Sequence, residues 1–583
     1  MHRKPLTILL ILCALVFANS LRNGFVGDDN FLILQNDFYS SWANVRDLFT
    51  SRYMTDSAQA ISPADNARYF SGSVAYRPVL SLTYFWDHAL WQENPLGYHL
   101  TSVLLHMANV GAVYFLVFLI GGQIGPAFLT ALIFAVHPFK SEAVCAISYR
   151  AGMVASLFLL GAMLAYLRFK KVVLSRWAIL AHTSFFLALF AKESAIVFPA
   201  LVFVYDRLFT ANTEKGGWLR RYAAPYSGYL GICAVYVYVY LFVFPNAQAS
   251  SVSWLGGGLV THVRTGFQIL AEYLSGFFFP LFVHVVPPVY VPQMPAPENV
   301  MAAVMVLTVV FAVWMSVLFA RRGKMNAFFI SWFWLALVPV SNIIPLVNPM
   351  AHRFMYLPSI GIAFLLAKFI QVAGEWLNQK LKSHYFVPIV AGTYLITCGI
   401  AAVAINAAWR HDFIMAYQLY QKHPRDPISH LFMGLTYIRI GEPEKAERVI
   451  LQGARLGLED PRVYYALALS RKDDLDVAIA YLNKGVEAYP DYAMLYLGLG
   501  RCYLLQGDLV QARQSLRRSL ALQSSYRAYN YLFQVLLMEG DMPAVEAVRD
   551  EITAVMQDPQ YDAFLAHTMD IKDTLTLPED NGF

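Results

Sequence analysis

Long apolar stretches dominate the chain as far as about residue 408, and a different pattern replaces them afterwards. As helices, stretches of this length can cross roughly 30 Å of hydrocarbon. Several are short or interrupted by charged residues, which inside a membrane usually serve a function. We expect eleven spans, centred on 6–22, 98–119, 124–139, 144–166, 177–191, 194–209, 223–245, 299–320, 327–347, 353–373 and 385–407.

A helical repeat begins after Trp409. Ala478 and Ala512 lie 34 residues apart, which is the period of the tetratricopeptide repeat. Small residues alternate with large ones, so that paired helices can pack closely. These positions are Gly434, Tyr437, Ala446, Ile450, Ala466, Leu469, Ala478, Leu482, Pro490, Gly500, Tyr503, Ala512 and Leu516. We predict a repeat domain over 409–560, with a degraded capping copy at 526–556, and a C-terminal tail over 561–583.

These two patterns predict an all-α chain, in which a polytopic membrane helix bundle over 1–408 precedes an α-solenoid. The composition agrees, because 57% of the 583 residues are hydrophobic and 14% are charged, with a mean hydropathy of +0.46. Soluble domains carry about 25% charged residues. The net charge of +5 comes from scattered Lys and Arg rather than from a basic stripe, so a nucleic-acid partner is not expected. The five cysteines form no CxxC pair and are interpreted as small apolar fillers, so no metal ligands are predicted.

Basic clusters predict the orientation of the spans, because Lys and Arg collect in cytoplasmic loops. With a retained first helix whose basic end is cytoplasmic, residues 246–298 must begin and end outside. The apolar segment over 262–284 therefore cannot cross once, and we expect a re-entrant or interfacial element there. Eleven spans place the repeats and the first long loop, 24–97, on the extracytoplasmic side. The clusters used are 168–171, 215–221, 321–324 and 380–382.

Charged and polar residues gather at the expected outer ends of the spans. Asp28 and Asp29 follow the first span and lie between apolar segments, where a carboxylate can become a general base rather than a solvated cap. Ordinary ion pairing, of Arg150 with Glu142 and of Lys192 with Glu193, is the structural alternative. Other members of the set are Arg77, His137, Arg353 and Tyr356, and His99 and His106 are expected to be satisfied core histidines rather than metal ligands.

A charged site at the lipid boundary suits a lipid-linked phosphosugar, whose phosphate lies at headgroup level and whose tail lies in the bilayer. Arginine and lysine would stabilise the leaving phosphate as charge develops on it. A carboxylate would take the proton from an acceptor hydroxyl arriving from water. In-line attack at the anomeric carbon would invert its configuration.

In their order and spacing, these motifs resemble the transmembrane and tetratricopeptide repeat-containing proteins, which belong with the protein O-mannosyltransferases in the GT-C class. The resemblance rests on the acidic pair followed by Asn36-Asp37, on Tyr76-Arg77-Pro78, on Tyr98-His99 with His106, on His137-Pro138 with Glu142 and Arg150, on Ala191-Lys192-Glu193, on the run from Arg353 to Ser359, and on the repeats. It departs from the family at His352, where a Glu is frequent, and in its short repeat array.

The resemblance implies a catalytic base in the acidic pair, with Asp28 favoured over Asp29. It also implies donor phosphate or sugar contacts at Arg77, His137, Glu142, Arg150, Lys192, Glu193, Arg353 and Tyr356. Topology alone adds Arg264, because this residue lies in the expected re-entrant element.

The expected function is that of an inverting integral membrane glycosyltransferase. Its donor would be a polyprenyl-phosphate sugar, with mannose one candidate, and its acceptor a hydroxyl of a protein or glycan, with a protein or peptide acceptor held by the repeats. No cofactor is assigned, and a need for a divalent metal stays open. The alternatives are a non-enzymatic scaffold that recruits partners through its repeats and a lipid-linked glycan transporter or ligase, for which a continuous polar path is lacking. A bacterial inner membrane is favoured over the endoplasmic reticulum, because the chain is compact and has few glycosylation sequons.

Overall fold

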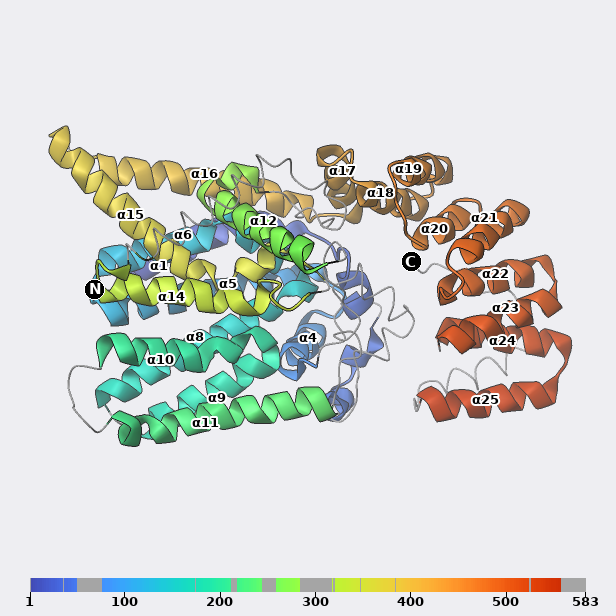
Figure 1. Ribbon diagram of the computed structural model, residues 1–583, viewed down its shortest axis with the longest axis horizontal. Coiled ribbons are helices and arrows are strands. Elements are labelled where there is room, and N and C mark those ends of the chain that lie inside the picture. Colours follow the sequence, from blue (N-terminus) through green and yellow to red (C-terminus); the bar gives the residue numbers. More distant parts are fainter. Residues whose placement is uncertain are drawn as a thin grey trace. The chain divides into compact units, whose positions relative to one another are not determined.

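The computed structural model describes residues 2–34, 36–49, 76–172, 175–210, 218–243, 258–283, 317, 320–346, 348–382, 384–523 and 526–556. Throughout these ranges the secondary structure is helical and no strand occurs (Figure 1). The all-α fold class is therefore confirmed. The described residues separate into two compact units, one extending to Met415 and the other beginning at Ala416.

The first unit is a bundle of mostly apolar helices. Its longer members are α1 (Arg3–Phe17), α4 (Pro78–Trp91), α5 (Pro95–Gly121), α6 (Ile124–Val136), α8 (Ala151–Val172), α9 (Ser175–Ala191), α10 (Phe198–Phe209), α11 (Trp218–Tyr238), α12 (Leu259–Phe278), α14 (Lys324–Leu337), α15 (Ser359–Lys380) and α16 (Phe386–Ala408). Helix α8 packs against α5 and α9, and α15 packs against α6 and α14. One apolar core runs through these contacts and includes Phe134, Tyr166, Phe198 and Trp332.

Short helical segments connect the longer helices and carry many of the polar residues. They are η1 (Ala18–Arg22), η2 (Asn30–Leu34), η3 (Asp37–Ser40), η4 (Trp42–Phe49), η5 (Pro138–Lys140), α7 (Ser141–Cys145), η6 (Ile147–Tyr149), η7 (Glu193–Val197), η8 (Val239–Val243), η10 (Pro280–Phe282), η11 (Val338–Val340) and η12 (His352–Met355).

Membrane-length helices account for much of the predicted span pattern. The described residues contain six helices long and apolar enough to cross a bilayer, or seven if α6 and the bent segment after it form one span. Shorter apolar helices, Ser175–Ala191 and Lys324–Val340, coincide with two more predicted spans, and α10 coincides with a third. These helices identify a multi-pass membrane protein. The predicted span over 299–320 falls almost wholly outside the described residues, so the count of eleven stays a prediction.

Two helices of the bundle lie where no crossing span was expected. Helix α4 lies inside the predicted first loop and packs against α5 and α9. Helix α12 occupies most of the predicted re-entrant segment, and it is not among the helices that are apolar enough to span. One face of α12 is buried, with Ile269, Tyr273 and Phe277 inside, while Val263, Phe267 and Phe278 are exposed. Its exposed apolar side chains suit contact with lipid.

The ends of α1 and α16 and the start of α8 meet at one end of the bundle. Asn23 Nδ2 donates to Asn406 O at 3.0 Å, and Gly24 N donates to Arg410 O at 3.2 Å. Asp29, a few residues after α1, accepts from the backbone that leads into α8. The acidic pair therefore lies at the end of α8 opposite to the basic cluster over 168–171.

The second unit is a run of helix hairpins (Figure 1). After α17 (Asp412–Lys422), which begins in the first unit, its helices are α18 (Pro427–Arg439), α19 (Pro443–Arg455), α20 (Arg462–Ser470), α21 (Leu475–Ala488), α22 (Ala493–Gln506), α23 (Leu509–Leu522), α24 (Tyr526–Glu539) and α25 (Met542–Met556). A Cβ on Gly500 would lie 2.5 Å from the Leu516 side chain, so the small residue is needed for close packing. The predicted tail over 561–583 lies outside the described residues.

Candidate functional site

A salt bridge between Glu142 and Arg353 lies at the centre of the candidate site. The Arg353 guanidinium pairs with Glu142 Oε1, and the Arg353 backbone N donates to Oε2 at 2.8 Å. The guanidinium carbon also lies 3.9 Å from the centroid of the Tyr149 ring. The Tyr149 hydroxyl donates to Asp28 Oδ2 at 3.1 Å. Four residues from separate segments of the chain are thereby joined at one end of the bundle.

A break in the helix at His137 brings Glu142 to this position. The residue before a proline avoids the helical conformation, and His137 is extended, with φ −70° and ψ 131°. The following segment, Pro138–Cys145, is bent by 57° from α6. The bend turns Glu142 toward η12, which carries Arg353.

Lys192 is a cation of this region for which no ion pair is found in the part of the chain that the structure describes. Its side chain is 7% exposed. It lines a pocket together with Arg353, Gly152 and Ser194, among others. The pKa of the Lys192 ammonium is lowered to about 8, mainly by burial. The Arg77 and Arg353 cations also lower this pKa, and the Glu193 carboxylate only partly offsets them. An anion entering the pocket would meet this ammonium.

Glu193 pairs with Arg77 rather than with its neighbour Lys192. Arg77 Nε donates to Oε2 at 3.0 Å and Nη2 donates to Oε1 at 2.7 Å. Burial opposes ionisation of Glu193, but the Arg77 guanidinium and the Lys192 ammonium outweigh it and hold the pKa at about 2. The pairing of Lys192 with Glu193, which was the structural alternative to a charged site, is therefore not found. The bidentate geometry of the guanidinium explains why Arg77 is the partner.

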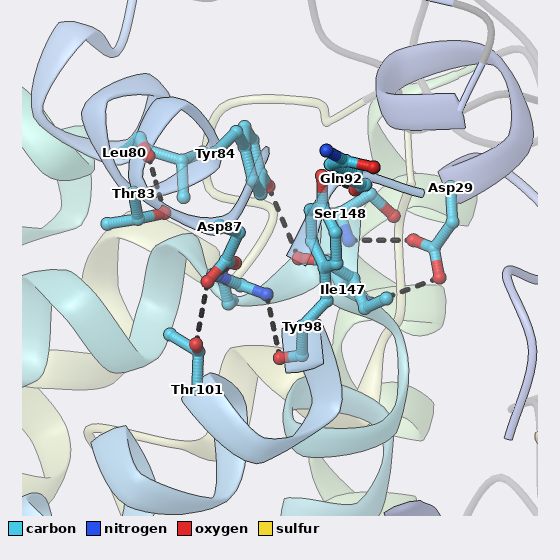
Figure 2. Close-up of polar contacts among 11 residues, drawn as sticks. Asp29, Leu80, Thr83, Tyr84, Asp87, Gln92, Tyr98, Thr101, Ile147 and Ser148 are labelled. Carbon is cyan, nitrogen blue, oxygen red and sulfur yellow. Dashed lines mark hydrogen bonds and ion pairs between the residues drawn. The ribbon is translucent and has the colours of Figure 1, made fainter. Parts of the chain in front are cut away.

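The two carboxylates of the acidic pair lie in different surroundings. Asp29 is 0% exposed. Its Oδ1 accepts from Ser148 N at 2.7 Å and its Oδ2 from Ile147 N at 3.2 Å (Figure 2). Burial raises the pKa of this carboxyl to about 6, although the backbone hydrogen bonds lower it. Asp29 thus holds the turn before α8, whereas Asp28 faces Tyr149.

Arg150 makes structural contacts, but not with Glu142, the partner that the alternative of ordinary ion pairing assigned to it. The buried guanidinium pairs with Asp87 of α4, and its Nη2 donates to Tyr98 O at 3.0 Å (Figure 2). Thr101 donates to the other Asp87 oxygen at 2.6 Å. Sequence analysis missed Asp87, because the helix that carries it was expected to be loop.

His137 and Tyr356 are tied into the protein by hydrogen bonds. His137 Nδ1 accepts from Phe139 N at 3.2 Å, and its Nε2 lies 3.2 Å from Phe277 O of α12. The Tyr356 hydroxyl lies 2.7 Å from His106 Nδ1, while the same tyrosine lines the pocket beside Lys192. His106 Nε2 is 3.0 Å from Ala135 O, so both of its nitrogens are occupied as expected of a core histidine.

Lys140 is a buried lysine that sequence analysis did not single out. Its ammonium bonds to the Ser359 hydroxyl and lies 4.2 Å from the centroid of the Phe134 ring. In the sequence, the one sign that Lys140 belongs to this region is its position two residues before Glu142. By binding α15, it fixes the segment that carries Glu142.

Helix α12 contributes Tyr273 to the site rather than Arg264. Ala351 N donates to the Tyr273 hydroxyl at 3.0 Å, next to η12. Arg264 is exposed, and among the described residues no contact joins it to the cluster. His352, where the family pattern often has Glu, stacks on Phe139 with ring centroids 4.9 Å apart.

Comparison with known proteins finds similarity to a repeat family and to a group of membrane proteins. Residues 465–531 match the tetratricopeptide repeat family. The chain is 30% identical over 206 residues to the human protein O-mannosyl-transferase TMTC3, covering 35% of this chain and 21% of that protein. It is 30% identical over 212 residues to human TMTC1 (34% and 23%) and 39% identical over 94 residues to human TMTC2 (16% and 11%), which are also named protein O-mannosyl-transferases.

The matched segments span less than a quarter of the length of these relatives. Further relatives come from Caenorhabditis elegans and Drosophila melanogaster. The expectation of a bacterial inner membrane therefore finds no support among these animal proteins. Their names, the repeat match and the apolar helices confirm the resemblance of the chain to the transmembrane and tetratricopeptide repeat-containing, O-mannosyltransferase-like family.

Proposed function

We propose that this protein is a glycosyltransferase that moves a sugar from a polyprenyl-phosphate donor to a hydroxyl of a protein or peptide acceptor. One observation carries the proposal. Lys192, which has no ion-pair partner among the described residues, lines a pocket with Arg353, and Arg353 is joined to Asp28 through Tyr149. A phosphate site and a carboxylate base thus lie close together at one end of a membrane bundle.

In this proposal the pocket, whose cavity of about 10 Å³ has room for about one water molecule, opens to admit the donor phosphate and the start of its lipid tail. Lys192 and Arg353 bind the phosphate oxygens and stabilise the charge that grows on them as the sugar leaves. Glu142 orients Arg353, and Glu193 orients Arg77. The remaining lining is mostly small or apolar, including Ala155, Leu159, Ala195, Ala336 and Val340. Such a surface suits an isoprenoid chain.

Asp28 acts as the general base, and Asp29 supports the backbone around it. The Asp28 carboxylate takes the proton of the acceptor hydroxyl, whose oxygen attacks the anomeric carbon. The bond between this carbon and the phosphate oxygen breaks, and its electron pair leaves with the phosphate. Attack opposite to the leaving group inverts the configuration, and mannose is the first sugar to test because of the names of the relatives.

We assign the site to the extracytoplasmic face, with the acceptor held by the repeats. The match over 465–531 favours a protein-binding role for this region. A pocket in the repeat unit is lined by Tyr465, Leu469 and Leu505 together with Lys472 and Arg501. Asp473 also lines this pocket, so the lining suits a peptide with apolar side chains and with charges of either sign. Donor contacts remain hypotheses for three further residues, Arg264, His137 and Arg150. Among the described residues, none of the three contacts the cations of the pocket.

The test is sugar transfer in membranes that contain the full chain and a polyprenyl-phosphate mannose donor. At equal protein level, D28N should lose at least 99% of the transfer rate and K192M at least 90%. D508A, which removes a helix cap in the repeats, should retain the rate of the unmodified chain. A scaffold without enzymatic activity would show no transfer in any variant, and a rate in D28N equal to that of the unmodified chain would refute the base assignment.

A further inference from the structure

Asp412, the first residue of α17, binds the loop that carries the acidic pair. Its Oδ1 accepts a hydrogen bond from Gly27 N at 2.7 Å. Its Oδ2 accepts one from Asn30 Nδ2 at 3.2 Å. These two partners lie immediately before and after Asp28 and Asp29 in the sequence. One carboxylate therefore spans the turn on which the proposed base is placed.

The conformation of Gly27 makes this contact important. Gly27 has a φ of +60°, in the left-handed region that favours glycine. A glycine turn is intrinsically mobile, because many backbone conformations are open to it. A charge-assisted hydrogen bond to its N–H selects one of them. The direction in which the next residue, Asp28, leaves the turn is thereby fixed.

Other contacts bring the same two segments together. Gly24 N donates to Arg410 O at 3.2 Å. Asn23 Nδ2 donates to Asn406 O at 3.0 Å. The ring centroids of Tyr149, which binds Asp28, and of Trp409 lie 6.3 Å apart. The end of α16 and the start of α17 thus follow the loop over 23–30 along its length, and Asp412 makes the contact nearest to the base.

We propose that Asp412 is a positioning residue that holds the Asp28 carboxylate in its place beside Tyr149 and Arg353. As far as it concerns catalysis, this proposal rests on the function proposed above. Because α17 continues from Asp412 to Lys422, the placement of the base depends on the helix through which the chain enters the repeats. A displacement at the start of α17 would then reach the base through this carboxylate.

Hydrogen exchange of the full chain in lipid nanodiscs tests the contact without any assay of activity. D412A should raise the amide exchange of residues 24–34 by at least tenfold. D412N, which keeps one acceptor oxygen for Gly27 N, should raise it less, and N30A should raise it from the other side of the contact. D426A is the matched control, because Asp426 caps α18 within the repeats through Ile428 N at 3.1 Å. Unchanged exchange over 24–34 in D412A overturns the proposal.

The kinetic readout separates positioning from a general loss of structure. A base displaced by about 1 Å lowers the rate roughly a hundredfold, so kcat of D412A should fall by at least tenfold. The KM for the donor should stay within twofold, because Lys192 and Arg353 are unaffected. Increased exchange with an unchanged kcat, or an equal loss in D426A, overturns the proposal. If the unmodified chain transfers no sugar, the proposed function fails and the exchange result alone decides whether Asp412 holds the loop.

Discussion

Lys192 gives the candidate site a charge that depends on pH within an accessible range. Burial lowers the pKa of its ammonium to about 8, so the cation is largely present at pH 7 and largely lost at pH 9. We predict that the KM for the donor rises as the pH increases through 8. A charge-assisted hydrogen bond contributes roughly 1.5–3 kcal/mol, so the rise should be about tenfold or more. Initial rates over a range of donor concentrations, measured from pH 6.5 to 9.5, check this.

The matched variant for this pH effect is K192R. A guanidinium stays protonated across the range, so the donor KM of K192R should be nearly independent of pH above 7.5. K192M should have a high KM at every pH. If K192R shows the same rise as the unmodified chain, the titrating group is elsewhere and Lys192 does not bind the phosphate.

Asp28 and Asp29 are adjacent in sequence but should respond to substitution in opposite ways. A general base contributes a factor of roughly 10²–10⁴, so D28N should lose at least 99% of kcat with little change in stability. D29N replaces a carboxylate that accepts from Ser148 N and Ile147 N, and an amide has a single acceptor oxygen. We expect D29N to unfold more easily, by about 1–3 kcal/mol, while its folded fraction keeps most of its activity. Thermal unfolding in detergent and transfer rates per folded molecule distinguish the two.

The charged residues of the candidate site could be picked out from the sequence, but their partners could not; that they bind the donor stays a prediction. Charged residues at the outer ends of apolar spans are visible in the sequence, because they interrupt hydrophobic runs. Their pairing depends on which ends meet in space, and sequence neighbours were a poor guide. Glu193 pairs with Arg77, and Arg150 with Asp87, each across a contact between segments far apart in the chain.

Within single elements, glycine positions report how closely two helices approach. A Cβ on Gly361 of α15 would lie 2.3 Å from Phe329 O and 2.8 Å from Phe333 N, both backbone atoms of α14. Backbone cannot move aside cheaply, so G361A should destabilise the protein by roughly 1–3 kcal/mol. G392A in α16 is the control, because nothing lies within 4 Å of its added Cβ and alanine favours helix over glycine by up to about 1 kcal/mol. The shift in unfolding temperature should be downward for G361A and zero or upward for G392A; equal shifts would contradict the close approach.

At the scale of elements, long helices were the most predictable feature and short ones the least. Spans such as α5 and α16 are apolar for more than twenty residues and coincide with the predicted segments. Helix α4 has 14 residues and lies between polar segments. Its run of apolar residues was therefore too short to distinguish it from a loop. That helix α12 does not cross the bilayer stays a prediction, and its inward side chains, such as Tyr273, cannot be distinguished from its outward ones without knowing what packs on the helix.

The placement of basic residues and of the site assigns the two ends of the bundle to opposite sides of a membrane. The acidic pair lies near the start of α8, and the basic cluster over 168–171 lies at its end. By the positive-inside rule, we expect the first end to face away from the cytoplasm. Helix α16 starts after the basic residues over 380–382 and ends at Ala408. Its Asn406 carbonyl accepts from Asn23 Nδ2 at the same end of the bundle as the acidic pair. The chain therefore enters the repeats on the side where the site opens.

This arrangement predicts the side on which introduced cysteines react. Asp491 in the repeats has a side chain that is 87% exposed, and Lys382, between α15 and α16, is exposed. In sealed cytoplasmic-side-in vesicles, a membrane-impermeant maleimide should label D491C without permeabilisation and K382C after it, above the background of the unmodified chain. Labelling of both without permeabilisation would mean that α16 does not cross. Labelling of K382C alone would place the repeats and the acidic pair in the cytoplasm, where an acceptor and a donor displayed outside could not reach the base.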